Sequence, residues 1–179
     1  SNGSHWQGGS DIVNHLSMSG NSQWTMTKDS TVAMLDMQDS LVSFKPDGGF
    51  KTLTVSGDLS GNGNFEMNSD VAALQGDLLK VEGNATGSHQ ILMHNSGSEP
   101  TVAGQHLMVV QTEGGDGKFS LSNTGGVVDV GTYQYSLESG SQVGGRDSDH
   151  YLVNTGRIST GADAGINTCL LYTSDAADE

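Results

Sequence analysis

The sequence predicts an all-β protein whose single chain winds into the coils of a parallel β-helix, a solenoid. Three observations support this prediction. Short runs alternate apolar and polar residues, which indicates strands with one buried face. Gly, Asn, Asp and Ser interrupt these runs at close intervals, and no stretch has the periodicity of an amphipathic helix. A loose repeat of apolar, polar, Gly and Asn or Asp recurs at about 20 residues, which is typical of solenoids.

Residues 1–52 are predicted to form coils of the β-helix. Each predicted strand has one parity that is mostly apolar, and the pairs are Trp24 and Met26, Val32 and Met34, and Val42 and Phe44. Turn-forming residues at 29–30, 38–40 and 46–49 separate these strands.

The repeat places Gly beside Asn or Asp at Gly20-Asn21, Gly57-Asp58 and Gly83-Asn84. Such pairs tolerate the left-handed backbone that tight corners require. We therefore expect left-handed corners at all three places.

Residues 53–156 continue the alternation and are predicted to form a thicker, better covered end. The predicted strands are 51–56, 63–67, 78–83, 89–94, 106–112, 117–122, 127–130, 132–138 and 150–154. Segments 91–93 and 107–110 are apolar on both parities, which predicts strands covered on both faces. The core of this region is predicted to consist of Leu53, Val55, Phe65, Leu79, Val81, Leu107, Val109, Phe119, Leu121, Tyr133, Tyr135 and Leu137.

Residues 157–179 are predicted to be a non-native or disordered tail, because the apolar periodicity fades after Gly156. Residues 168–179 match nothing earlier in composition or rhythm and are interpreted as read-through or expression-derived sequence. Cys169, the one cysteine, lies there, so no intrachain disulfide framework is expected.

Composition narrows the classes of partner. The formal net charge is −14, from 7 Lys and Arg against 21 Asp and Glu, so the chain is expected to repel phosphate backbones and to bind no nucleic acid. No apolar run reaches the length of a membrane span, and no basic segment precedes an apolar one as in a signal peptide. The chain begins within the repeat pattern, which predicts a fragment of a longer protein.

Candidate metal sites are weak. Asp58, Ser60 and Asn62 have the spacing of the first half of a calcium loop, but Ser69 stands where the loop needs a Glu, so a turn is the favoured interpretation. His89 and His94 are five residues apart, which places them on opposite faces of one strand. No metal and no cofactor is predicted.

No catalytic residue is predicted either. A β-helical glycan hydrolase needs paired acids across a groove. The pairs on offer, Asp36 with Asp39 and Asp70 with Asp77, stand in turn-like settings and are expected to be solvated. Tyr133 and Tyr135 share a parity, so they could form a glycan-stacking platform, but core residues are the favoured interpretation.

An ordered set of motifs resembles the C-terminal passenger segment of classical Gram-negative autotransporters, the pertactin-like and AIDA-like group of type V secretion. The resemblance covers roughly residues 15–153, and no single motif is decisive. The motifs are Trp24-Thr25-Met26-Thr27, Val42-Ser43-Phe44, Phe50-Lys51-Thr52-Leu53-Thr54-Val55, Gly61-Asn62-Gly63-Asn64-Phe65-Glu66-Met67-Asn68, Asp77-Leu78-Leu79-Lys80-Val81-Glu82-Gly83, Ala85-Thr86-Gly87-Ser88-His89, Asn95-Ser96-Gly97-Ser98-Glu99-Pro100 and Asp129-Val130-Gly131-Thr132-Tyr133-Gln134-Tyr135-Ser136-Leu137.

The resemblance implies a right-handed, single-stranded parallel β-helix with a C-terminal β-rich cap. Residues 1–52 would be rungs, and 53–156 the autochaperone that folds first outside the cell and templates the other coils. One departure is His150, which stands where the family usually has Trp and is expected to alter the packing of the last strand.

The implied partners are the protein's own upstream passenger rungs and its own C-terminal β-barrel. The implied location is the bacterial cell surface, tethered to the outer membrane or released from it. Three functions remain open: a folding and export module, which is favoured; an adhesin surface for host glycans or matrix; and a β-helical carbohydrate-active enzyme, which the lack of a recognisable acid pair disfavours.

Overall fold

The structure is a computed structural model that describes residues 3–11 and 13–157. The strands among these residues form two β-sheets. An eight-stranded sheet runs in the order β1 (His5–Gly8), β3 (Gln23–Met26), β5 (Met34–Phe44), β7 (Leu59–Asp70), β10 (Ser88–Asn95) and β12 (Lys118–Leu121), with β2 (His15–Ser19) paired to β5 and β8 (Gln75–Gly76) to β7. A seven-stranded sheet runs in the order β13 (Val127–Val130), β14 (Tyr133–Ser139), β15 (His150–Arg157), β11 (His106–Gly114), β9 (Leu78–Asn84), β6 (Thr52–Val55) and β4 (Ser30–Val32). Two short 3-10 turns, η1 (Thr124–Gly126) and η2 (Gly140–Val143), complete the described elements.

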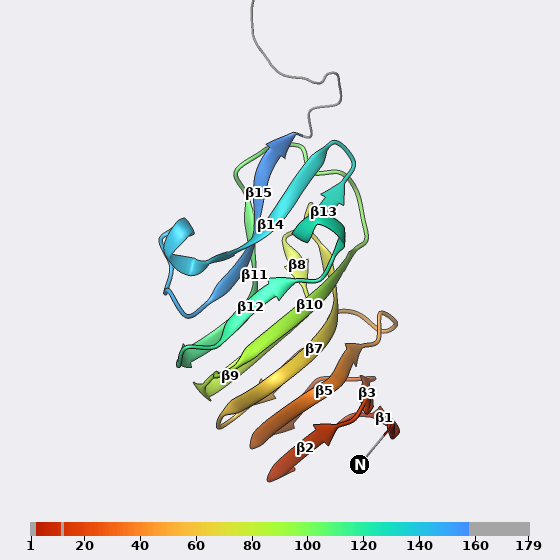
Figure 1. Cartoon of the computed structure of the whole chain (residues 1–179). Helices are drawn as coiled ribbons and strands as arrows, with labels where there is room; N and C mark the ends of the chain where they lie inside the picture. Colours follow the sequence, from red (N-terminus) through yellow and green to blue (C-terminus); the bar gives the residue numbers. More distant parts are fainter. Residues whose placement is uncertain (1–2, 12, 158–179) are drawn as a thin grey trace, which may run out of the picture.

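The chain alternates between the two sheets, and each strand of the solenoid lies parallel to the equivalent strand of the previous coil (Figure 1). One column of register partners consists of Trp6, Trp24, Val42, Phe65, Ile91 and Leu121. Partners are 18 residues apart between Trp6 and Trp24 and 30 apart between Ile91 and Leu121, so the coils lengthen toward the C-terminus. The prediction of an all-β parallel β-helix is confirmed.

Two long strands replace three shorter predicted ones. Residues 34–44 form one strand, β5, with a shift of register between Gln38 and Ser40 instead of the predicted turn. Asp39 has a φ of 49° at this point, so the strand bends without losing its neighbours. In the same way β7 begins at Leu59, where a turn was predicted over the Gly-Asn pairs. The turn prediction was wrong because a left-handed residue can make a corner inside a continuous ladder.

The corner glycines serve two different purposes. Gly61 and Gly87 have φ values of 92° and 85°, and a Cβ on Gly61 would lie 1.9 Å from the Met37 carbonyl oxygen. Gly57 and Gly83 have no positive φ, so the left-handed prediction was wrong there. A Cβ on Gly83 would lie 2.5 Å from the Gly57 carbonyl oxygen, and these glycines are therefore needed because adjacent coils approach closely.

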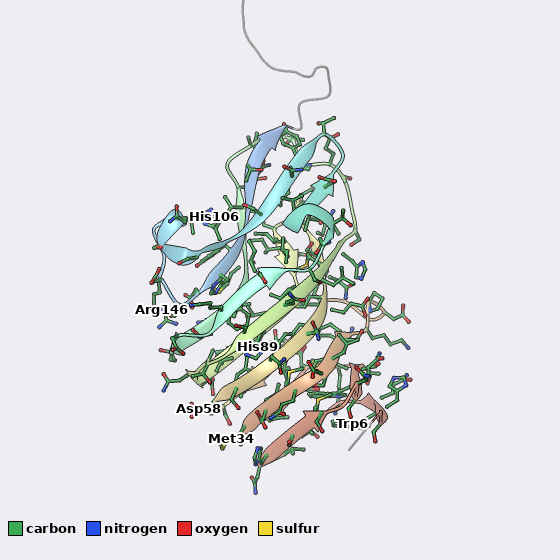
Figure 2. The ribbon with its side chains drawn as sticks, viewed as in Figure 1. Trp6, Met34, Asp58, His89, His106 and Arg146 are labelled. Atoms are coloured by element: carbon green, nitrogen blue, oxygen red, sulfur yellow. The ribbon has the colours of Figure 1, made fainter. Side chains whose placement is uncertain are left out.

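One hydrophobic cluster fills the interior from the first coils to the last strand. Trp24, Met26, Val42 and Phe44 are buried as their parity predicts. Met34 is 46% exposed, because β4 ends at Val32 and β5 starts at Met34, and the chain turns between the two strands. Figure 2 shows Met34 at the edge of the solenoid.

The direction of pairing reverses at β11. This strand lies parallel to β9 on one side and antiparallel to β15 on the other. Strand β14 pairs in antiparallel fashion with both β15 and β13, and the three strands form the cap at the top of Figure 1. The strands of the rungs below therefore pair in parallel, whereas the strands at the end of the seven-stranded sheet pair in antiparallel fashion.

The apolar run in β11 is explained by a bulge. The register of β11 against β15 shifts between Met108 and Val110, and Val109 and Val110 are both fully buried. Leu92 and Met108 are only partly buried. For residues 107–110 the prediction of cover on both faces was wrong, because the bulge turns two successive side chains to the same interior. In β10 the pairing is regular: Ile91 and Met93 face the interior, and the other face, at Leu92, is covered only in part.

Two predictions about the chain's division stay predictions. The boundary at 52/53 falls inside β6, after its first residue, and the hydrophobic cluster continues across it. Apart from Arg157, the tail predicted at 157–179 lies outside the described residues. Within the described residues, no helix has the length and apolar character to cross a membrane.

We predict that Gly61→Ala lowers stability by more than the strained φ alone would cost. A backbone conformation of this kind costs an ordinary residue about 1–3 kcal/mol, and the contact with the Met37 carbonyl oxygen adds to that cost. The midpoint of urea unfolding measures the loss. Gly48→Ala is the matched control, since Gly48 has a φ of 81° and nothing lies within 4 Å of the place that an added methyl group would take. Equal losses in the two variants would contradict the close-approach explanation.

Candidate functional site

The residues predicted as the core of 53–156 all lie in or against the interior cluster. Nine of the twelve are buried, and Leu107, Leu121 and Leu137 are partly buried and pack against the others. Tyr135 is fully buried, and its hydroxyl accepts a hydrogen bond from Nδ2 of Asn154 at 3.2 Å. Tyr133 is 6% exposed, so both tyrosines are core residues, which is the favoured interpretation of this pair. The role of these residues in folding stays a prediction.

A column of four rings joins the solenoid to the cap. The rings are Phe65 on β7, His89 on β10, Phe119 on β12 and His150 on β15. Successive ring centroids are 6.0, 5.3 and 5.0 Å apart. The two phenylalanines were predicted as core residues, but no sequence pattern indicated that two histidines complete the column.

His89 is held as a neutral imidazole between adjacent coils (Figure 2). Its Nδ1 accepts a hydrogen bond from the Gly63 backbone N–H at 3.0 Å. Its Nε2 lies 2.9 Å from the Thr86 carbonyl oxygen, to which it donates. Both nitrogens are thus used only when the proton sits on Nε2. Burial lowers the pKa of His89, although the Thr86 carbonyl acts in the opposite sense.

His150 packs its ring on Phe119, with the ring centroids 5.0 Å apart. Burial lowers the pKa of His150, and the Ser148 backbone with the Asp149 and Asp147 carboxylates opposes that effect only in part. Nδ1 of His150 is buried and makes no hydrogen bond with the part of the chain that the structure describes.

A buried carboxylate pins the start of β15 to β11. Asp149 is 4% exposed and accepts the Thr112 backbone N–H at 3.0 Å. Arg146 bonds to Glu113, Asp149 and the Thr112 carbonyl, and the two carboxylates raise the pKa of Arg146 further above its already high ordinary value. Figure 2 shows Arg146 at the rim of this junction. No local sequence pattern signals the network, because Glu113 and Thr112 on β11 lie 33 to 37 residues before Arg146 and Asp149 along the chain.

The predicted solvated carboxylates are in part structural. Asp77 is only 1% exposed and accepts the backbone N–H groups of Lys51 and Asn68, both at 2.7 Å, so the prediction of a solvated side chain was wrong there. Burial raises the pKa of Asp77, and these hydrogen bonds oppose the effect. Asp36 and Asp39 accept hydrogen bonds from Ser60 and Asn62 of the next coil.

In the segment that resembles half of a calcium loop, the side chains of Asp58, Ser60 and Asn62 make hydrogen bonds to adjacent coils. Asp58 accepts the Asn84 backbone N–H at 2.8 Å, whereas Ser60 and Asn62 donate to the preceding coil. His94 faces outward, opposite to buried His89 as the odd spacing predicts, and its Nε2 lies 2.8 Å from Glu66, whose pKa the contact lowers. Among the described residues, no group of three or more His, Cys, Asp or Glu is placed to hold a metal ion.

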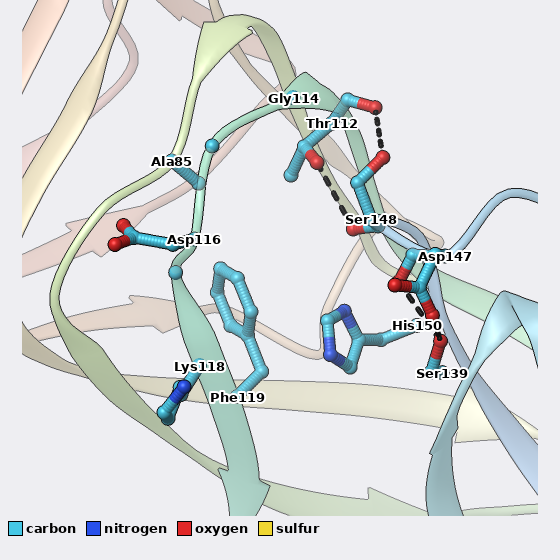
Figure 3. Close-up of a pocket in the computed structure, with 12 residues that line it drawn as sticks. Ala85, Thr112, Gly114, Asp116, Lys118, Phe119, Ser139, Asp147, Ser148 and His150 are labelled. Atoms are coloured by element: carbon cyan, nitrogen blue, oxygen red, sulfur yellow. Dashed lines mark hydrogen bonds between the residues drawn. The ribbon is translucent and has the colours of Figure 1, made fainter.

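A cavity of about 690 Å³ opens at the junction of solenoid and cap (Figure 3). Phe119 and His150 form one wall, and Lys118, Asp116, Asp147 and Ser139 lie around it. Hydroxyls of Ser139 and Ser141 donate to the Asp147 carboxylate and lower its pKa. A second cavity of about 650 Å³ shares Lys118 and Phe119 with the first and extends over β10 and β7. The cavities offer donors, acceptors and a ring face for binding.

Comparison with known proteins identifies relatives along most of the chain. The sequence model of the Pertactin family matches residues 27–145. The autotransporter adhesin/invasin TibA of Escherichia coli O78:H11 (strain H10407 / ETEC) is 41% identical over 137 residues, covering 73% of this chain and 14% of that protein. The BrkA autotransporter of Bordetella pertussis (strain Tohama I / ATCC BAA-589 / NCTC 13251) is 38% identical over 139 residues, covering 75% of this chain and 14% of that protein. The chain thus spans about a seventh of the length of these relatives.

The crystal structure of the Haemophilus influenzae Hap adhesin superposes on this chain with a TM-score of 0.71 and 28% identity. The match covers 86% of this chain and 16% of the Hap chain. With the parallel coils and the antiparallel end, these likenesses define the class: a β-helical passenger domain of an autotransporter, a surface protein associated with the outer membrane. Within that class, the chain belongs to the Pertactin family.

We predict that the protein loses stability as the pH falls below about 6.5, the ordinary histidine pKa of an unfolded chain. His89 and His150 have lowered pKa values in the folded state, so the unfolded state binds more protons in this range. The stability that the two neutral histidines contribute is complete above about pH 6.5. It is lost as the pH falls toward the pKa that each histidine has in the folded state. The slope is up to about 1.4 kcal/mol per pH unit for each histidine that stays neutral.

Urea unfolding midpoints measured at several pH values test this prediction. His89→Gln keeps an acceptor for the Gly63 N–H and should flatten the pH dependence, even if it lowers stability at neutral pH. His15→Gln is the control, because His15 is exposed and its side chain makes no hydrogen bond or ion pair with the described residues. Glu66 also contributes to stability, because its pKa is lowered in the folded state. That contribution is lost only below pH 4.5, so it does not overlap with the pH range of the histidines. An unchanged slope in His89→Gln would refute the assignment.

Proposed function

We propose that residues 53–156 act as an autochaperone, a segment that folds first during secretion and templates the coils before it. The observation that carries this proposal is the reversal of pairing at β11, where β15 closes the seven-stranded sheet in antiparallel fashion. A parallel coil obtains its backbone hydrogen bonds from neighbouring coils. The cap strands β13, β14 and β15 obtain theirs mainly from one another, so this end can order before the other coils exist.

The entropy of ordering supports the same sequence of events. A coil without a template must order its backbone at about 1–2 kcal/mol per residue with few compensating contacts. The cap combines short hairpin-type pairings with the Tyr135 and Leu152 side chains, both fully buried. Once it has formed, each further coil adds to an existing edge. Folding outside the cell would then bias export in one direction without a nucleotide energy source.

The proposed partners follow from the two ends of the solenoid. At the first coil, Trp6 is 38% exposed and stacks on Trp24 with the ring centroids 4.8 Å apart, and the parent protein's upstream rungs would continue this column. At the cap end, the parent protein's own β-barrel would follow and tether the passenger to the outer membrane. Cleavage between the cap and the barrel would release it.

A second candidate is an adhesin surface within this segment. It is favoured by the names of two similar proteins, the adhesin/invasin TibA and the Hap adhesin. We propose no catalytic role, because the carboxylates offered as acid pairs make hydrogen bonds between coils or cap a turn.

We predict that Leu79→Asp, Val81→Asp, Phe119→Asp or Tyr135→Asp reduces surface display of an upstream passenger several-fold. Each change places an unpaired charge in the interior, which is among the most destabilising substitutions known. The measurement is protease-resistant passenger on whole cells that express the full autotransporter, with the inserted barrel quantified in parallel.

Val102→Asp is the matched control, since Val102 is 52% exposed and should tolerate the same charge. The proposal fails if passenger display and protease resistance are normal in the four core variants. A fall in barrel insertion that matches the fall in display would also count against it, because the defect would then precede folding of the passenger.

A further inference from the structure

The two cavities at the junction form one groove that crosses successive coils. They adjoin at Lys118 and Phe119, which line both. In the second cavity, Asn64, Gln90 and Ser120 are register partners on β7, β10 and β12. Their side chains therefore repeat at the strand spacing of about 4.8 Å along the solenoid axis. A third, smaller hollow of about 220 Å³ shares Asp39 and Asn64 with the second cavity and continues toward the first coils.

The groove carries polar groups that the described protein leaves without partners. Nδ1 of His150 is buried in the wall and has no hydrogen bond from the described residues, and Figure 3 shows its ring directed into the cavity between Phe119 and Ser148. Lys118 is exposed, and its ammonium group forms no hydrogen bond or ion pair with residues 3–11 and 13–157. Buried polar atoms cost free energy unless a partner satisfies them.

The chemistry of the walls selects one class of ligand. Around Lys118, the groove presents the amides of Asn62, Asn64 and Gln90 and several serine hydroxyls. Its charged groups are Lys118 against the carboxylates of Asp39, Asp116 and Asp147. This excess of negative charge disfavours sulfated, sialylated or phosphorylated chains. Mixed donors and acceptors beside a ring face suit ligands whose hydroxyl groups both donate and accept hydrogen bonds.

We propose that this groove binds an uncharged oligosaccharide that lies along the solenoid axis, with one sugar at the Phe119 and His150 wall and further sugars over the amide ladder. Sugar hydroxyls donate to the Asp147 carboxylate and accept from Lys118, and one sugar ring packs against the Phe119 and His150 wall. The continuity of the cavities across three strands explains why the ligand is a chain of several sugars. This inference rests on the adhesin candidate and is independent of the autochaperone role.

The first experiment uses the full chain on an array of uncharged, sulfated and sialylated oligosaccharides, followed by calorimetric titration of the strongest uncharged ligand. We expect binding to uncharged chains of several sugars and weaker binding to their sulfated forms. Gln90→Ala and Lys118→Ala should each weaken binding at least about tenfold, equivalent to about 1.4 kcal/mol. Gln75→Ala is the control, because it removes an exposed amide on β8 outside the groove. Unchanged unfolding midpoints show that the variants remain folded.

Three results would overturn the proposal: no binding to uncharged glycans, preference for sulfated chains, or equal affinity in all three variants. Whole-cell adherence of the full autotransporter separates this failure from failure of the adhesin candidate. If adherence persists in Gln90→Ala and Lys118→Ala while the isolated chain binds no glycan, adhesion resides elsewhere and only the groove assignment falls. If wild-type cells do not adhere at all, the adhesin candidate itself falls.

Discussion

The hydrogen-bonding demand of the backbone governs this structure. An interior parallel strand satisfies its N–H and C=O groups only through the strands of the coils before and after it. Side chains at equivalent positions must therefore stack: Val32 lies on Val55 and Val55 on Val81, all fully or nearly fully buried. The same demand leaves the last coil without a partner, and the antiparallel pairing of β15 with β11 supplies one. The cap is thus part of the same hydrogen-bonding scheme as the rungs.

The sequence predicted the strands well wherever alternation is local. The segment 127–130 coincides with β13, and Trp24, Met26, Val42 and Phe44 point inward as expected. Corners were harder to predict. Asp39 bends β5 without ending it, and nothing within the local sequence distinguishes such a bend from a turn. Met34 was wrongly predicted to share the buried face of Val32. The chain turns between β4 and β5, so the alternation of buried and exposed residues does not continue from one strand to the next.

The polar interior was largely beyond prediction, because its contacts are distant in sequence. His89 bonds to Gly63, 26 residues earlier, and Asp149 to Thr112, 37 residues earlier. In both pairs one partner is a backbone N–H group, which has no side-chain identity to recognise. Burial of Asp77 was missed for the same reason. The ring column and the groove appeared only once the coils were assembled in space.

The reversal at β11 also makes the two ends of the molecule unlike each other. At one end of the seven-stranded sheet, β4 pairs in parallel with β6, whereas β13 at the other end belongs to an antiparallel hairpin. Two copies meeting end to end would have to join these unlike rows in a head-to-tail contact, the type that generates open filaments when it repeats. A mismatch in strand direction at every such joint removes the repeating template. The antiparallel hairpin that ends the seven-stranded sheet therefore offers no template for a further parallel coil at the cap.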